Sequence, residues 1–177
     1  VSVEPVVLAE NSPYAITKEH LEQINSEYDR LAELLLKSKK EGKWFNFFHF
    51  MVDLENGPCL KKRITGCGAG NEYIAVTPEG DIFPCHQFVG EDRFKMGSVL
   101  DESFNKVMQS EFKACNIETK PACKKCWAKY FCSGGCAANA YKYNGDITKP
   151  YELTRELEKK RTECAIGLYI KERENND

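Results

Sequence analysis

Two stretches of the chain repeat apolar residues every three or four positions, which is the spacing of one face of a helix. The apolar positions of the first stretch are Leu21, Ile24, Tyr28, Leu31 and Leu35. Those of the second stretch, which begins near Pro150, are Leu153, Leu157, Cys164 and Leu168. The spacing predicts two amphipathic helices, and it turns the Cys164 side chain inward with the second apolar face.

Short apolar runs lie on both sides of the first predicted helix. Residues 1–8 are rich in β-branched side chains, and residues 44–52 are rich in aromatic ones, so each run is typical of a buried strand. The order strand, helix, strand belongs to an α/β fold, and we expect it to be the last β/α unit of a barrel. The sequence starts at Val1 without a secretory signal pattern, and we expect it to be part of a longer protein.

Glycine and cysteine become dense from about Asn56, which predicts a boundary between residues 1–55 and residues 56–177. Just beyond it, residues 73–76 and 81–83 read as two short strands around a Thr-Pro-Glu-Gly turn. This pattern predicts a β-hairpin with Cys85 at its exit.

A short helix is expected after the hairpin. Asp101 is a suitable residue to cap it. The predicted apolar face consists of Phe104, Val107, Met108 and Phe112.

Composition argues against some classes of function, above all binding to nucleic acid or to a membrane. Of 177 residues, 42% are apolar and 29% are charged, which is ordinary for a globular protein. The 25 basic and 27 acidic residues leave a net charge of -2, so nothing favours nucleic-acid binding. No apolar run approaches the roughly 20 residues that span a bilayer. We therefore expect a cytoplasmic protein that binds neither nucleic acid nor membrane.

Nine cysteines are an odd number, and without a secretory signal they favour thiolate metal ligands over disulfides. The strongest motif is CKKCWAKYFCSGGC, a C-x2-C-x5-C-x3-C spacing, in which Gly134 and Gly135 relieve crowding of backbone near a bulky group. Its cysteines are Cys123, Cys126, Cys132 and Cys136.

The other cysteines extend this motif. Cys67 and Cys85 lie upstream with the spacing C-x12-G-x4-C, and Cys164 stands alone downstream. In order and spacing, these seven cysteines resemble the SPASM domain, the two-cluster extension of radical SAM enzymes that mature peptides and proteins. The resemblance covers about residues 59–170. It implies an α+β fold in which a β-hairpin and helices surround two four-iron clusters.

The resemblance also implies which cysteines share a cluster. One cluster would be held by Cys123, Cys126, Cys132 and Cys164. The other would be held by Cys67, Cys85 and Cys136, and either Cys59 completes it or one iron stays open for a substrate thiolate. Such sharing between neighbouring clusters has a precedent in two-cluster ferredoxins. Cys115 matches no ligand position and is interpreted as a small buried hydrophobe.

Residues 57–99 resemble the maturases of SCIFF peptides more closely than other SPASM proteins. This resemblance implies thioether (sactionine) crosslinks in a cysteine-rich, ribosomally made precursor peptide, formed with SAM and a reductant such as ferredoxin or flavodoxin. SAM and a third four-iron cluster need a C-x3-C-x2-C loop, and Asn139 stands where that loop's third cysteine would be. We therefore expect these residues to be inactive alone, with the SAM-binding part in a segment that precedes them.

Two alternatives remain at this point. C-x2-C spacings are also common in structural zinc sites, so a zinc-binding interaction module would explain the tight motif, although not the distant cysteines in their order. Another SPASM enzyme, such as a sulfatase maturase or a different peptide cyclase, would share the cysteines and differ in substrate.

Overall fold

The computed structural model describes residues 1–8, 11–57 and 59–174. Its packing separates two compact units, and each is described by itself. We call Val1–Pro58 together with Glu152–Asp177 the helical unit, and Cys59–Tyr151 the cysteine-rich unit. The carboxy-terminal residues thus pack with the amino-terminal segment, whereas the sequence grouped them with the cysteines.

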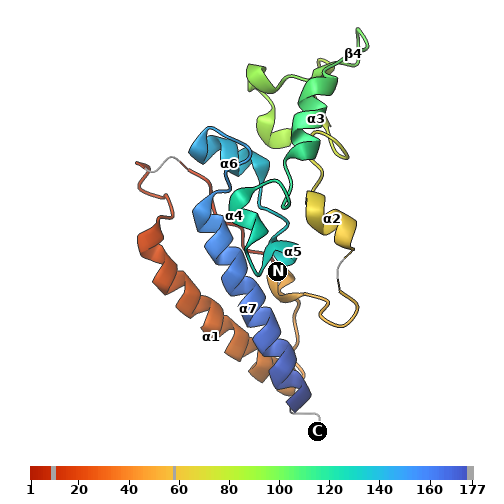
Figure 1. Cartoon of the computed structure of the whole chain (residues 1–177). Helices are drawn as coiled ribbons and strands as arrows, with labels where there is room; N and C mark the ends of the chain where they lie inside the picture. Colours follow the sequence, from red (N-terminus) through yellow and green to blue (C-terminus); the bar gives the residue numbers. More distant parts are fainter. Residues whose placement is uncertain (9–10, 58, 175–177) are drawn as a thin grey trace. The chain divides into compact units, whose positions relative to one another are not determined.

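Two long helices that lie side by side form the helical unit (Figure 1): α1, Leu21–Lys40, and α7, Glu152–Glu174. The short 3-10 helices η1, Lys18–His20, and η2, Phe48–Phe50, complete its regular structure. Both predicted helices are confirmed. The apolar stripe of α7 is buried as expected at Leu153, Leu157, Cys164 and Leu168.

The two strands predicted in this unit are wrong. Residues 1–8 and 44–52 form no strand, and η2 occupies part of the second run. The two runs do meet, because the Phe48 N–H donates to the Val1 carbonyl at 2.8 Å and the Val1 amino group donates to the Asn46 carbonyl at 2.7 Å. These two hydrogen bonds do not extend into a β-ladder, so the runs meet without forming strands.

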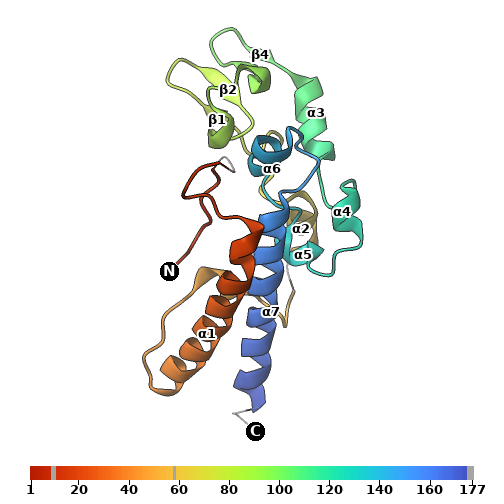
Figure 2. The same cartoon turned by 90° about the vertical axis from the view of Figure 1, so that its left-hand side faces the viewer.

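The cysteine-rich unit is built from short elements around a four-stranded antiparallel sheet of order β1-β2-β3-β4. Figure 2 shows β1, β2 and β4 near the start of α3. The strands are β1, Ala75–Val76; β2, Asp81–Phe83; β3, Gly97–Ser98; and β4, Ser103–Phe104. The helices are α2, Leu60–Thr65; η3, His86–Phe88; η4, Asp92–Phe94; α3, Lys106–Ala114; α4, Pro121–Lys124; α5, Lys129–Cys132; and α6, Ala137–Asn144.

The predicted hairpin is confirmed by the pairing of β1 with β2, in which Ala75 lies opposite Phe83. Its turn is closed by the Gly80 N–H, which donates to the Thr77 carbonyl at 2.9 Å. Gly80 has a φ of +88°, which explains why glycine is the last residue of the turn. Helices combined with a small antiparallel sheet agree with the expected α+β class.

The helix after the sheet differs from the prediction at its start. The Asn105 side chain, not Asp101, caps α3 by accepting the Met108 N–H at 3.0 Å. Asp101 instead accepts the Ser103 N–H in the turn before β4. Val107, expected on the apolar face, is 71% exposed.

Aromatic rings fill the centre of the cysteine-rich unit. The rings of Phe88 and Phe94 lie 4.3 Å apart, and Phe112 meets Phe88 edge-on at 5.5 Å. Cys85 is a buried member of the same cluster, and Cys136 packs against it. Two predicted ligands therefore lie at the edge of the apolar core. Among the described residues, no helix is both long and apolar enough to cross a membrane.

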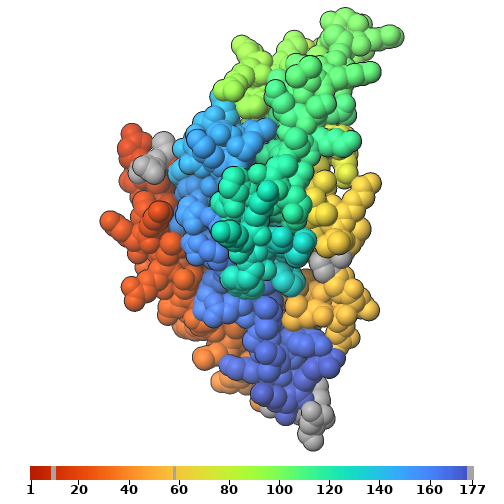
Figure 3. Space-filling model, viewed as in Figure 1, coloured from red at the N-terminus to blue at the C-terminus, as the bar shows by residue number. Residues whose placement is uncertain are grey.

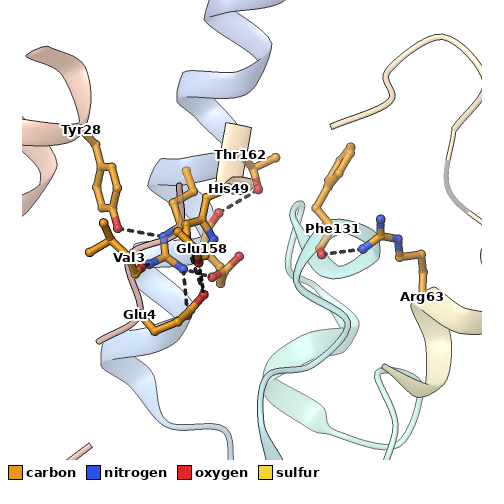
Figure 4. Close-up of polar contacts among 10 residues, drawn as sticks. Val3, Glu4, Tyr28, His49, Arg63, Phe131, Glu158 and Thr162 are labelled. Atoms are coloured by element: carbon orange, nitrogen blue, oxygen red, sulfur yellow. Dashed lines mark hydrogen bonds and ion pairs between the residues drawn. The ribbon is translucent and has the colours of Figure 1, made fainter. Parts of the chain in front are cut away.

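A buried arginine connects the parts of the helical unit. Arg161 on α7 is 3% exposed. Its guanidinium donates to the Tyr28 hydroxyl at 2.8 Å and to the Val3 carbonyl at 2.7 Å, and it pairs with Glu158 at 2.5 Å. Figure 4 shows Tyr28, Val3 and Glu158 converging on this point. The guanidinium thus links α7 to α1 and to the amino-terminal segment.

We expect Arg161→Ala to lower the free energy of unfolding by about 3 kcal/mol, because the buried Tyr28 hydroxyl and the part-buried Val3 carbonyl lose their donor. Arg30→Ala is the matched control, since the Arg30 side chain is 70% exposed and its pair with Glu27 lies on the surface. That change should stay within about 0.5 kcal/mol. Urea denaturation followed by circular dichroism measures both, and equal midpoints would contradict the role of Arg161.

Candidate metal centre

Three of the predicted ligands, Cys67, Cys85 and Cys136, lie together in the cysteine-rich unit. The Cys85 thiol interacts electrostatically with both of the other thiols. Burial raises the pKa of Cys85, and the backbone N–H groups of Gln87 and Phe88 oppose that rise. The Cys85 thiol is therefore neutral at pH 7, and a metal that bound it would have to displace its proton.

Gly66 places Cys67 beside the loop that precedes Cys136. It ends α2 with φ +67° and ψ -134°, a conformation essentially restricted to glycine. A Cβ on Gly66 would lie 3.2 Å from the carbonyl oxygen of Ser133, so the two backbones are in close contact. Cys67, the next residue, therefore begins beside the loop that carries Cys136.

The segment that contains Cys67 is also hydrogen-bonded to the exit of the β1-β2 hairpin. The Gly70 N–H donates to the Pro84 carbonyl at 2.9 Å, immediately before Cys85. Arg63 on α2 also donates to the Phe131 carbonyl at 3.3 Å, as Figure 4 shows. In Figure 3 the surface of α2, in yellow, adjoins the teal surface of α4 and α5. These contacts explain how thiols distant in sequence meet.

A second group of predicted ligands comes from consecutive short helices. Cys123 lies on α4 and is buried, and the Cys126 N–H donates to its carbonyl at 2.9 Å. Cys132 is the last residue of α5 and is partly buried. One turn connects the two helices, so the three cysteines occupy a single compact segment.

The loop between Cys132 and Cys136 separates the two groups. Ser133, Gly134 and Gly135 all have left-handed backbone, with φ values of 56°, 83° and 72°. Three such residues in succession reverse the chain, and only glycine adopts this backbone without strain. A Cβ on Gly134 would lie 3.1 Å from the Ile117 side chain, whereas one on Gly135 would meet nothing within 4 Å.

Beside this loop lies a buried cation. Lys120 is 2% exposed, and its ammonium donates to the Gly134 carbonyl at 2.9 Å. No Asp or Glu carboxylate pairs with it among the residues that the structure describes. Since an isolated buried charge is costly, this neighbourhood suits an anion. Thiol donors and a buried cation fit an iron-sulfur cluster, whose thiolate ligands give it negative charge.

Two other cysteines, Cys115 and Cys59, belong to neither group of three, although the Cys115 thiol interacts electrostatically with that of Cys123. Cys115 is half-buried and donates to the Ile147 carbonyl at 3.1 Å. Burial raises the pKa of the Cys115 thiol, and the nearby Lys120 ammonium opposes this. Cys59 is exposed at the start of α2, where its carbonyl accepts the Arg63 N–H at 3.1 Å.

Cys164 lies in the helical unit, on α7, and is buried. Its thiol donates to an Asp29 carboxylate oxygen at 3.7 Å. Burial raises its pKa to about 11; the Lys160 ammonium opposes the rise, and Asp29 adds to it. Its inward orientation was predicted from helix periodicity, whereas its sharing of a cluster with Cys123 stays a prediction.

None of the nine cysteines, all of which lie in the described part of the chain, forms a disulfide. Across residues 1–8, 11–57 and 59–174, no group of three or more His, Cys, Asp or Glu side chains is placed to hold a metal ion. The assignment of each thiol to a cluster therefore stays a prediction.

Sequence spacing missed two residues next to these thiols, Gln87 and Lys120. Gln87 donates its side-chain N–H to the Cys136 sulfur at 3.5 Å. His86, which directly follows Cys85, instead contacts the Tyr73 hydroxyl at 3.2 Å. The only available signal was nearness in sequence to Cys85 and Cys123, which does not distinguish these residues from their neighbours.

Comparison with known families identifies the domain. Residues 67–127 match the family model of SPASM, described as an iron-sulfur cluster-binding domain. The chain therefore contains a SPASM domain, as its cysteine spacing predicted. The match includes Cys67, Cys85, Cys123 and Cys126, and it ends before Cys132.

Solved structures of anSMEcpe, an anaerobic sulfatase-maturating enzyme, share the fold. The histidine-tagged form with bound AdoMet gives a TM-score of 0.63 at 18% identity over 98% of this chain and 46% of that one. The native form with bound AdoMet and Cp18Cys peptide gives 0.63 at 17% identity over 98% and 48%. This chain thus spans about half the length of these structures.

The loop between the two cysteine groups provides a test. Gly135→Ala should cost about 1 kcal/mol of stability, because only its positive φ is strained. Gly134→Ala should cost about 2–4 kcal/mol, since its methyl group also presses on Ile117. Thermal unfolding and bound iron per chain measure both variants. Equal effects of the two would show that packing against Ile117 does not constrain this loop.

Proposed function

We propose that this chain is the auxiliary-cluster part of a radical SAM peptide maturase. The observation that supports the proposal is the electrostatic interaction of the Cys85 thiol with the Cys67 and Cys136 thiols, which come from segments distant in sequence. The SPASM match and the fold shared with AdoMet-bound structures support it. The specific reaction proposed is thioether formation in a cysteine-rich precursor peptide.

Two four-iron clusters are proposed within these residues. One has the ligands Cys123, Cys126, Cys132 and Cys164. The other has Cys67, Cys85 and Cys136, with Cys59 or a substrate thiolate at the remaining iron. Lys120 supports this proposal, because a buried ammonium beside the loop of Ser133, Gly134 and Gly135 would balance anionic groups there.

When bound, such clusters supply a one-electron acceptor and iron sites that bind thiolates. The chain's own residues hold the iron through cysteine sulfur, exclude water with the Phe88 and Phe94 rings, and offset negative charge with Lys120. Cys59 is exposed, so the side of the site near α2 is open to a peptide.

The proposed reaction is an oxidation of the peptide. A 5′-deoxyadenosyl radical, made from SAM by one electron, takes a hydrogen atom from an α-carbon and leaves as 5′-deoxyadenosine. The peptide cysteine loses its thiol proton, its sulfur bonds to that carbon, and one electron passes to an acceptor. The peptide therefore loses two hydrogens. SAM, a third cluster and a reductant such as ferredoxin or flavodoxin are assigned to the full-length protein, so these residues alone should not react.

Metal content distinguishes this proposal from a zinc module. Residues 1–177 purified without oxygen should be brown and contain about eight iron and eight sulfide per chain, as expected for two four-iron clusters. Metal analysis and visible absorption measure this. Colourless protein with stoichiometric zinc would refute the clusters and favour the zinc-binding module.

Single substitutions test which thiols are ligands. Cys123→Ser should lower the iron content by about half, because one Cys-ligated cluster loses a ligand. Cys115→Ser is the matched control, since Cys115 is half-buried in the same unit and is not a proposed ligand, and it should keep the iron of the unmodified protein. Equal iron loss in both variants would contradict the assignment.

The reaction is tested with the full-length protein, SAM, dithionite and a cysteine-rich peptide. Thioether formation predicts a product lighter by two hydrogens in which one cysteine no longer reacts with iodoacetamide, both measured by mass spectrometry. A sulfatase-maturase-like activity would instead oxidise a side chain without joining two residues. A peptide that keeps every reactive thiol while 5′-deoxyadenosine accumulates would refute the thioether proposal.

A further inference from the structure

Gln87 contacts the sulfur atom of one cysteine in the first thiol group. Its side-chain N–H donates to Cys136 Sγ at 3.5 Å. Gln87 lies in η3, His86–Phe88, directly after Cys85 at the exit of the hairpin. A residue on the sheet side of the site thus reaches the thiol at the start of α6.

The neighbours of Gln87 fix its position. On one side, the His86 ring is hydrogen-bonded to the Tyr73 hydroxyl at 3.2 Å. On the other side, Phe88 is 1% exposed and packs against the rings of the core. The Phe88 N–H also donates to the Cys85 carbonyl at 3.0 Å, which closes η3. Gln87 is therefore held by both flanking residues and directed toward Cys136.

Hydrogen bonds to ligand sulfur change a cluster's reduction potential. A donor stabilises the form that carries more negative charge on sulfur, which is the reduced cluster. An amide carries no net charge, so it does this without the desolvation cost of a buried cation. Gln87 has the donor that this role requires, whereas a glutamate of the same shape would place an acceptor against the sulfur.

We propose that Gln87 positions Cys136 and raises the reduction potential of the cluster bound by Cys67, Cys85 and Cys136, through the side-chain N–H that it directs at the Cys136 sulfur. This inference rests on the proposed function, because it requires that cluster. It adds a residue that neither cysteine spacing nor the family match assigns. Gln87 acts through the ligands and is thus a positioning residue.

The test uses the reconstituted full-length protein and potentiometric titration followed by electron paramagnetic resonance. Gln87→Met keeps the length of the side chain and removes the donor. At a fixed potential, the ratio of reduced to oxidised cluster should fall by up to about tenfold, equivalent to about 59 mV for a one-electron couple. Only one cluster should change. Gln87→Glu should lower the ratio further.

Gln109→Met is the matched control, because Gln109 lies on α3 and makes no contact with a cysteine sulfur among the described residues. It should leave every potential unchanged. An unchanged potential in a fully loaded Gln87→Met protein would overturn the inference. Unmodified protein without auxiliary iron would instead refute the proposed function, so the two failures are distinguishable.

If Gln87→Met does not retain its iron, Gln87→Lys decides the question, because lysine restores an N–H donor of similar reach. A loaded Gln87→Lys protein with a potential at or above that of the unmodified protein supports the inference. A loaded Gln87→Lys protein with a lower potential than the unmodified protein overturns the inference. Loss of iron from both the lysine and the methionine variants also overturns it, provided that the circular dichroism of the Gln109→Met control is unchanged.

Discussion

The cysteine-rich unit buries polar and charged groups, whose burial is costly unless a partner compensates for the lost water. Cys85 and Cys123 are buried thiols, and Lys120 is a buried cation with no carboxylate partner in the described part of the chain. The regular elements around them are short, with strands of two or three residues. Such elements are marginal by themselves, and they pack around the aromatic core that includes Cys85. An anionic cluster with thiolate ligands would satisfy the thiols and the ammonium together.

The helical unit is stabilised differently. Its two long helices bury conventional apolar stripes, and its buried arginine has its partners within the unit, because Arg161 reaches Tyr28, Val3 and Glu158. This unit therefore satisfies its own buried charge, whereas the cysteine-rich unit leaves Lys120 unbalanced. The contrast places the unbalanced buried charge in the cysteine-rich unit.

Sequence reasoning succeeded where a local pattern determines the structure. The helices α1 and α7 follow from three- and four-residue spacing, and the hairpin follows from the Pro and Gly of its turn. It failed for residues 1–8 and 44–52, because apolar, β-branched composition does not distinguish a strand from an extended segment that lacks a neighbouring ladder.

For the candidate site, cysteine spacing selected the thiols, since ligand spacing is a property of the sequence itself, and their assignment to clusters stays a prediction. It did not identify Gln87 or Lys120, whose roles depend on which segments fold against Cys136 and Gly134. The cap of α3 was mispredicted for a similar reason. Asp101 and Asn105 are equally suitable capping residues, and Asn105 is the cap because β4 lies between Asp101 and the start of the helix.

The loop of Ser133, Gly134 and Gly135 explains why neighbouring cysteines belong to different thiol groups. Cys132 ends α5, and Cys136 begins α6, so a continuous helix through both would place them on one face. Three consecutive left-handed residues prevent that helix and turn Cys136 toward Cys85, where Gln87 meets its sulfur. Because Lys120 also holds this loop through Gly134, the same three residues fix the position of Cys136 on one side and contact the buried ammonium on the other.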